Sequence, residues 1–176
     1  LLAEEVKPGL ASLVRGTTDS EWIYALLLSC LEDPFAIPAG EALVEAIART
    51  LAIIRRARER VGIDTSSSVN LFVSDGTQIA AVRYCFDFGR YDTADPTRIH
   101  EANLDFLSLW YTLGSGYGFH EGEWRMTGGA GRADSILVAS EPLTRDVASW
   151  VEVPEYSVLH ACIRDGRPAV SVRYID

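Results

Sequence analysis

An acidic residue at the start of a helix is the feature of this sequence best suited to binding a small charged molecule. Asp19 follows Thr18 and precedes Ser20 and Glu21, and apolar residues then recur at helical spacing. This pattern predicts that Thr18 caps the helix and that Glu21 reaches back toward it as a capping box. Asp19 would then be the first helical residue, and rigid backbone would hold its carboxylate where it can bind a positively charged group. The alternative is structural, because acids also stabilise the first turn of a helix through its partial positive charge.

The remaining residues with reactive side chains lie far apart in the sequence. The candidates are His100, His120, His160, Cys30, Cys85 and Cys162. No two of them have the spacing of a metal site, so we expect neither a metal nor a cofactor. Cys30 and Cys85 fall inside apolar patterns, which indicates core thiols. A general base at His120 and a nucleophile at Cys162 are the alternatives to a surface histidine and a thiol without catalytic function.

Two groups of charged residues allow more than one interpretation. The four arginines between positions 55 and 60 could form a phosphate site, but a solvated face that complements the negative end of a helix is the simpler interpretation. Arg83 could reach the mouth of a site, but we expect it to form a structural ion pair. Glu141 could accept hydrogen bonds from backbone amides near a site, or it could belong to a turn that Pro142 ends.

The composition indicates a globular chain of one domain. The 176 residues are 48% hydrophobic and 23% charged, with a formal net charge of −9. A chain of this length can bury a substantial core. The negative charge disfavours a nucleic-acid partner, because phosphate binding requires clustered lysine and arginine. We find neither an apolar run long enough to span a bilayer nor a signal peptide, and the three widely spaced cysteines fit a reducing compartment. We therefore expect a cytoplasmic protein with no membrane partner.

The expected elements change from helices to strands along the chain. One helix follows Thr18 and stops at Asp33-Pro34, and a second runs from about Glu41 to Val61. Beyond residue 68 the apolar period becomes that of strands, with hairpin turns at Asp75-Gly76 and Asp165-Gly166. The predicted strands are Val69–Ser74, Gln78–Phe86, Leu104–Leu113, Gly122–Met126, Ser135–Ser140, Trp150–Val153, Ser157–Ile163 and Pro168–Tyr174.

Three segments between these elements are expected to be irregular. The polar stretch from Gly89 to Asn103 is predicted to be a surface loop, and the glycine-rich residues 114–118 are predicted to connect two strands. Residues 127–132 are also rich in glycine, and we expect them to be mobile. Two helices followed by largely antiparallel strands place the chain in the α+β class.

Four segments carry the most specific pattern in the sequence. They are Gly16–Glu21, Val69–Gly76, Ile79–Tyr84 and Leu137–Leu143. In this order they resemble the second half of a class II glutamine amidotransferase domain, which belongs to the N-terminal-nucleophile hydrolase superfamily. The resemblance covers about Gly16 to Pro154. It is strongest to the branch that acts on γ-glutamyl compounds, including the glutathione-degrading amidotransferase subunit.

The resemblance implies a fold and a role for the acidic helix start. The implied fold is an αββα sandwich of mostly antiparallel strands, incomplete in this chain, with residues 1–176 as the C-terminal portion of a single glutamine amidotransferase domain. The aspartate of the family's Thr-Asp-Ser-Glu stretch binds the α-amino group of the substrate. In this sequence that residue is Asp19, and Thr18 stands beside it in the implied binding site. The Ala-Ser-Glu run at 139–141 also matches the family, where its role is mainly architectural.

The resemblance also implies chemistry for which this chain lacks the nucleophile. In the family an N-terminal cysteine attacks the γ-amide carbonyl, and water completes the hydrolysis. This chain begins with Leu1-Leu2, so we expect an upstream segment or a second subunit or domain to supply the nucleophile. The expected function is hydrolysis of a γ-glutamyl amide, either glutamine or a small γ-glutamyl compound such as glutathione, with this chain as the α-amino-binding half. The alternative is a non-catalytic α+β module that binds a partner protein.

Overall fold

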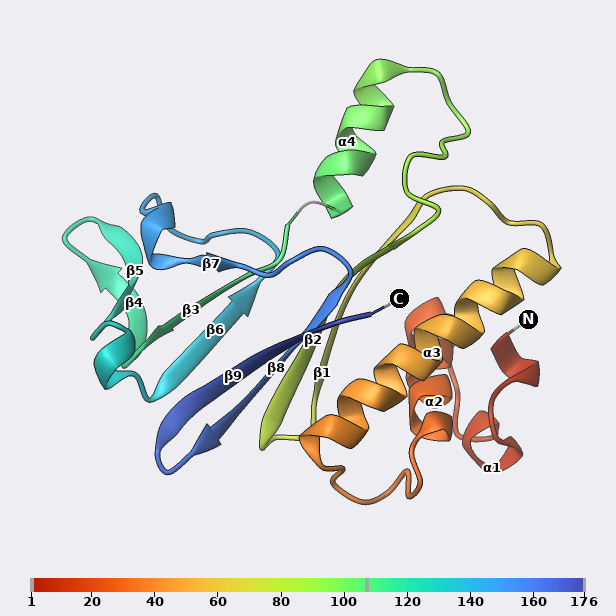
Figure 1. Ribbon diagram of the computed structural model, residues 1–176, viewed down its shortest axis with the longest axis horizontal. Coiled ribbons are helices and arrows are strands. Elements are labelled where there is room, and N and C mark those ends of the chain that lie inside the picture. Colours follow the sequence, from red (N-terminus) through yellow and green to blue (C-terminus); the bar gives the residue numbers. More distant parts are fainter. Residues whose placement is uncertain (1, 107, 176) are drawn as a thin grey trace. The chain divides into compact units, whose positions relative to one another are not determined.

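The computed structural model describes residues 2–106 and 108–175, and the chain divides between Asp64 and Thr65 into two compact units. The first unit contains only helices, and the second contains all the described strands (Figure 1). Helices and largely antiparallel strands confirm the α+β class.

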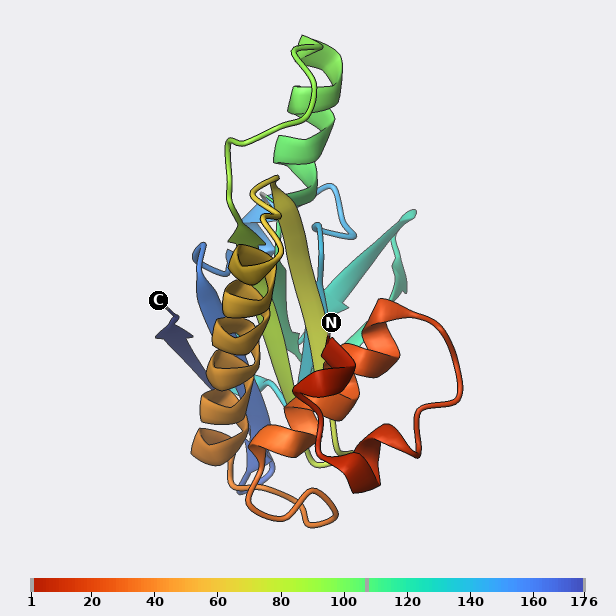
Figure 2. The same ribbon diagram turned by 90° about the vertical axis from the view of Figure 1, so that its right-hand side faces the viewer.

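The helical unit consists of two substantial helices and a tethered N-terminal segment. Its elements are η1 (Leu2–Glu4), α1 (Pro8–Ala11), α2 (Asp19–Cys30) and α3 (Gly40–Arg60). In Figure 2, α3 is the long helix drawn in orange to gold. The N-terminal segment is tied to both helices. Lys7 donates from its backbone N to Ser29 Oγ at 3.0 Å, and Arg60 pairs with Glu5 at 2.7 Å. The predicted bounds of α2 and α3 are confirmed to within a few residues.

A four-stranded antiparallel sheet forms one layer of the second unit. Its strands are β1 (Ser67–Ser74), β2 (Gln78–Phe86), β8 (Ser157–Arg164) and β9 (Arg167–Tyr174), in the order β1-β2-β8-β9. The two predicted hairpin turns are confirmed. Gly76 has a φ of 89°, while Asp165 and Gly166 have φ values of 51° and 73°. Such left-handed conformations favour Asp-Gly pairs in tight hairpins.

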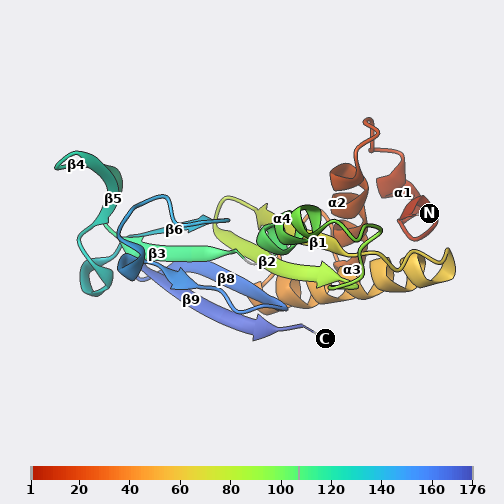
Figure 3. The ribbon, with the colours of Figure 1, turned by 90° about the horizontal axis from the view of Figure 1, so that it is seen from above.

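A smaller sheet and a separate ribbon complete the described strands. The sheet has the order β6-β3-β7, from β3 (Trp110–Gly114), β6 (Ser135–Ala139) and β7 (Val151–Glu152). The ribbon pairs β4 (Gly116–His120) with β5 (Glu123–Thr127). Seen from above, β3 and β6 form a layer alongside β8 and β9 (Figure 3).

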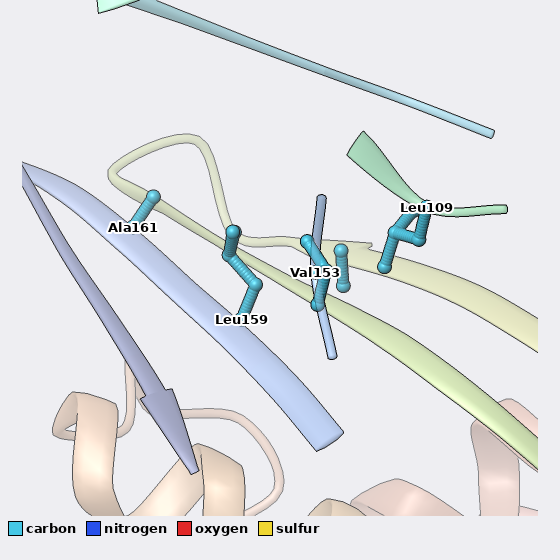
Figure 4. Packing of buried hydrophobic residues seen from close by; sticks show 5 residues of the cluster. Leu109, Val153, Leu159 and Ala161 are labelled. Carbon is cyan, nitrogen blue, oxygen red and sulfur yellow. The ribbon is translucent and has the colours of Figure 1, made fainter. Parts of the chain in front are cut away.

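The core of the second unit lies between its two sheets. Ala81 of β2 and Leu159 and Ala161 of β8 pack with Leu109 and Val153, which stand next to β3 and β7 (Figure 4). Each of these five side chains is at most 1% exposed. Partly buried residues of β3, β6 and β9 pack around them: Tyr111, Ile136, Val138 and Val170. Apolar residues of both sheets therefore pack against one another across the space between them.

Arg83 crosses between the two sheets beside this core. Its side chain is 2% exposed, and Nη1 donates to Glu152 Oε1 at 2.8 Å and to the Val153 carbonyl at 2.5 Å. Nη2 also lies 3.6 Å from a carboxylate oxygen of Glu155. The expected structural ion pair is thus confirmed. A guanidinium suits this position because its planar fork can satisfy several acceptors at once.

Three sequence-based expectations need correction. Residues 96–103 belong to α4 (Pro96–Phe106) and not to a loop, and the predicted strand Leu104–Leu113 begins only at Trp110. Leu107 lies outside the described residues. The helix begins with Pro96, and Asp95 Oδ1 accepts from Thr97 N at 2.9 Å. This Asp-Pro start is a recognised helix signal that the polar composition obscured.

The glycine-rich residues 114–118 are likewise not a plain connection, because Gly116 already begins β4. Residues 127–132 include the last residue of β5 and the short η2 turn (Ala130–Arg132), and their expected mobility stays a prediction. Glycine lowered the apparent strand propensity here, whereas pairing with β5 across the ribbon compensates for it.

Replacing Arg83 with Met should lower the free energy of unfolding by about 1–3 kcal/mol, because the buried Val153 carbonyl would lose its donor. The matched control is Arg125→Met, since Arg125 pairs with Glu121 at 2.6 Å but both side chains are well exposed. An exposed pair of this kind contributes at most about 0.5 kcal/mol. Urea unfolding followed by tryptophan fluorescence measures both changes, and equal losses in the two variants would contradict a special role for Arg83.

Candidate functional site

The site predicted from the sequence is built on the first turn of α2. Thr18 is the N-cap, with extended backbone at φ −79° and ψ 147°, and its Oγ1 accepts from Glu21 N at 3.4 Å. Asp19 is therefore the first residue of the helix, as predicted. The cap fixes the backbone on one side of Asp19, and the helix fixes it on the other. The backbone atoms that carry this carboxylate are therefore held in place.

The Asp19 carboxylate is exposed and only half engaged. Its Oδ1 accepts from Ser20 N at 2.8 Å and from Ser20 Oγ at 3.4 Å. No described residue donates a hydrogen bond to Oδ2. One oxygen thus anchors the side chain on the helix start, and the other can accept a charge-assisted hydrogen bond from a cation such as a substrate ammonium.

The Glu21 side chain does not accept from the Thr18 backbone amide, as a capping box would, but from the amide of Gly16. Its Oε1 accepts from the backbone N of Gly16 at 3.1 Å, and its Oε2 is 3.4 Å from Thr18 Oγ1. The side chain thus reaches two residues beyond the cap. Gly16 permits this because a Cβ there would lie 1.8 Å from Glu21 Oε2. The sequence signal for this contact was the glycine five residues before the glutamate.

The other reactive side chains do not gather around Asp19. Cys85 is buried, with its Sγ 3.4 Å from the Phe86 carbonyl, which confirms a core thiol. Cys30 and Cys162 are half-buried, and His100 and His120 are exposed. Among the described residues no group of three or more His, Cys, Asp or Glu side chains could hold a metal ion. At the end of α3, Arg60 pairs with Glu5.

A second polar cluster, which the sequence did not suggest, joins the β1–β2 turn to β8. His160 Nε2 lies 2.7 Å from Gln78 Oε1, and Gln78 Nε2 donates to Asp75 Oδ2 at 2.6 Å. His160 is buried, and this burial, followed by the nearby charge of Arg164, lowers the pKa of its imidazole. The antiparallel pairing of β2 with β8 was the available signal, because it places Gln78 and His160 on one face.

Asp75 is the anionic end of this Asp75–Gln78–His160 cluster. Desolvation is the largest single influence on its carboxyl and would raise the pKa. The hydrogen bonds from the Gln78 and Thr77 side chains and backbone amides together outweigh it, and they hold the pKa at about 2. The carboxylate thus organises the hairpin turn as an acceptor for several donors.

Comparison with known proteins agrees with the resemblance seen in the sequence. The chain is similar to a protein of Saccharomyces cerevisiae named probable glutamine amidotransferase DUG3, with 29% identity over 170 residues. The match covers 90% of this chain and 44% of the yeast protein, so the chain spans less than half the length of this curated relative. No family model matches the chain, and no solved structure matches it. The similarity supports a relationship to glutamine amidotransferases, which are enzymes.

One negative finding concerns membranes. Within the described residues, no helix combines the length and the apolar character needed to cross a bilayer.

Replacing Thr18 with Ala should destabilise the protein by roughly 0.5–2 kcal/mol, because the Glu21 amide loses its side-chain acceptor. Thr17 is the matched control, since it is equally exposed and precedes the cap. Thermal unfolding of Thr18→Ala and Thr17→Ala gives the comparison. A capping role for Thr18 would be wrong if both variants melted at the temperature of the parent protein.

Acid should weaken the protein in two steps that follow from the lowered pKa values. His160 has a folded pKa below its unfolded value of 6.5, so its contribution is full above that pH and declines as the pH falls below it. Asp75 contributes fully above its unfolded value of 3.8, and this contribution is lost as the pH falls toward about 2. Urea midpoints from pH 7 to pH 2 should therefore fall in both windows. In Asp75→Asn the lower step should shrink, and an unchanged lower step would refute this assignment.

Proposed function

We propose that this chain is the α-amino-binding portion of an N-terminal-nucleophile glutamine amidotransferase domain that hydrolyses a γ-glutamyl amide. The observation that carries the proposal is the exposed Asp19 carboxylate, fixed by the cap of α2 and half engaged by Ser20. In the sequence it matches the α-amino-binding aspartate of the family's Thr-Asp-Ser-Glu stretch. The similarity to a named glutamine amidotransferase over 90% of the chain supports the same assignment.

In this proposal the substrate is glutamine or a small γ-glutamyl compound such as glutathione. Its α-ammonium group would donate to Asp19 Oδ2, which no described residue engages. A charge-assisted hydrogen bond of this kind fixes the end of the substrate that lies away from the scissile amide. Binding at this remote end positions the γ-carbonyl for attack, which is the main contribution that such a residue makes to the rate.

The nucleophile in this proposal is a cysteine supplied by an upstream segment or by a second subunit or domain. The cysteines of this chain fit that assignment, because Cys85 is buried and neither Cys30 nor Cys162 is fully exposed. The proposal also includes the four-layer αββα sandwich, which that segment would complete. It places the reaction in the cytoplasm, without a nucleic-acid or membrane partner.

A non-catalytic module that binds a partner protein is the second candidate, and one observation favours it. The β4–β5 ribbon carries Phe119 and Trp124, whose side chains are 62% and 54% exposed. Exposed aromatic side chains close together are common where proteins bind one another. Turnover of a γ-glutamyl amide by the complete protein would decide between the two candidates.

The test is steady-state hydrolysis of glutamine and of glutathione by the complete protein, with residues 1–176 joined to the nucleophile-bearing segment. Asp19→Asn should raise KM by about 10- to 150-fold, because a charged hydrogen bond contributes about 1.5–3 kcal/mol. Glu41→Gln is the matched control, since Glu41 is also an exposed acid in the first turn of a helix. Its KM should equal that of the parent protein.

Two results would overturn the proposal. An unchanged KM in a folded Asp19→Asn protein would remove Asp19 from the site. Efficient turnover by residues 1–176 alone would show that the nucleophile lies within this chain.

A further inference from the structure

The Glu21 side chain links α2 back to the short loop that precedes the helix. The Glu21 carboxylate accepts from Gly16 N through Oε1 at 3.1 Å and lies 3.4 Å from Thr18 Oγ1 through Oε2. The backbone amide of Glu21 returns a bond to Thr18 Oγ1 at 3.4 Å. Residues on both sides of Asp19 are thereby connected through one carboxylate, which we call the Gly16–Glu21 clamp.

The clamp is more than an ordinary helix cap. A capping box satisfies the amide of the cap residue itself, whereas Glu21 holds an amide two residues earlier. The Gly16 amide lies outside α2, and Thr18 already supplies the side-chain cap of the helix. The contact does restrict the direction in which the chain enters the helix, and hence the backbone from which the Asp19 side chain starts.

Packing at Gly16 shows how closely the clamp is fitted. A Cβ on Gly16 would meet Glu21 Oε2 at 1.8 Å and Glu21 Cδ at 2.8 Å. The obstructing atoms are the far end of a flexible side chain, so an added methyl group would displace the carboxylate instead of unfolding the helix. The φ of Gly16 is not in the left-handed region, so alanine is compatible with its backbone.

We infer that Glu21 and Gly16 are positioning residues for the carboxylate of Asp19. This inference rests on the proposed function, and it assigns Glu21 and Gly16 a role in affinity that acts through Asp19. The clamp holds the loop so that Asp19 Oδ1 stays on Ser20 N and Oδ2 stays available to the substrate ammonium. Neither clamp residue touches the substrate. Their effect passes entirely through Asp19.

The experiment compares glutamine with glutaramate, which is glutamine without its α-amino group, in the complete protein. Glu21→Ala removes the carboxylate, and Gly16→Ala displaces it. In both variants the KM for glutamine should rise about three- to thirtyfold, or about 0.7–2 kcal/mol, with little change in kcat, because residues in one hydrogen-bond network are energetically coupled. The KM for glutaramate should not change, because that compound offers Asp19 no ammonium group.

Three further variants make the comparison specific. Glu21→Gln keeps an oxygen that can accept from Gly16 N, so its KM should return close to that of the parent protein. In an Asp19→Asn background, Glu21→Ala should raise the glutamine KM no further. Gly9→Ala is the control for adding a methyl group, because nothing lies within 4 Å of a Cβ at Gly9.

The outcomes separate this inference from the proposed function. If Asp19→Asn leaves the glutamine KM unchanged, the proposed site itself is wrong. If Asp19→Asn raises KM but Gly16→Ala and Glu21→Ala do not, only the positioning role is wrong. Equal rises in KM for glutamine and glutaramate would show that the clamp supports the fold in general, and this too would overturn the inference. Gly16→Ala keeps the test decisive if Glu21→Ala fails to fold.

Discussion

The buried guanidinium of Arg83 is the interaction on which the β-rich unit depends. It starts on β2, at the centre of the four-stranded sheet, and ends on Glu152 and Val153 at the edge of the smaller sheet. β7 has only two residues and two pairings with β3, so its backbone ladder alone holds it weakly. The hydrogen bonds from the Arg83 side chain therefore attach β7 to the unit, as backbone hydrogen bonds would attach a longer strand. They also keep Val153 in the core.

Two buried polar side chains of this unit, those of Arg83 and His160, each have a partner of suitable chemistry. Glu152 and Glu155 stay about half exposed, so the ion pair with Arg83 keeps one side in water and avoids the full cost of desolvation. The Asp75–Gln78–His160 cluster follows the same rule. The Asp75 carboxylate lies at the exposed turn, and the neutral side-chain amide of Gln78 hydrogen-bonds both to it and to His160. Burial favours the uncharged form of the His160 imidazole. The sheets therefore tolerate Arg83 and His160 because each has a hydrogen-bond partner and the carboxylates of the two networks lie toward water.

The sequence predicted the parts of the fold that local chemistry determines. Thr18 and Asp75-Gly76 behaved as expected, because caps and tight turns depend on a few adjacent residues. The polar surface of α4 and the glycines of β4 hid their structure, since neither has a clear apolar period. The place of Asp19 at the helix start was predictable, whereas the contact from Glu21 to Gly16 was not. The contact from Glu21 to Gly16 depends on the path of the loop before α2, and the secondary-structure propensities of single residues do not determine that path.

The β4–β5 ribbon is attached to the rest of its unit at a narrow base. A Cβ on Gly114 would lie 2.2 Å from the Thr127 carbonyl, and one on Gly128 would lie 1.8 Å from Ser115 Oγ, so both glycines are needed where the two strands leave the sheet. Beyond that base the two strands pair only with each other among the described strands. Such a ribbon can open without breaking either sheet, so its amide hydrogens should exchange with solvent through local fluctuations. The amide hydrogens of the central strands β2 and β8 should instead require global unfolding for exchange. We therefore expect the β-rich unit to combine slowly exchanging central strands with a ribbon that exchanges rapidly.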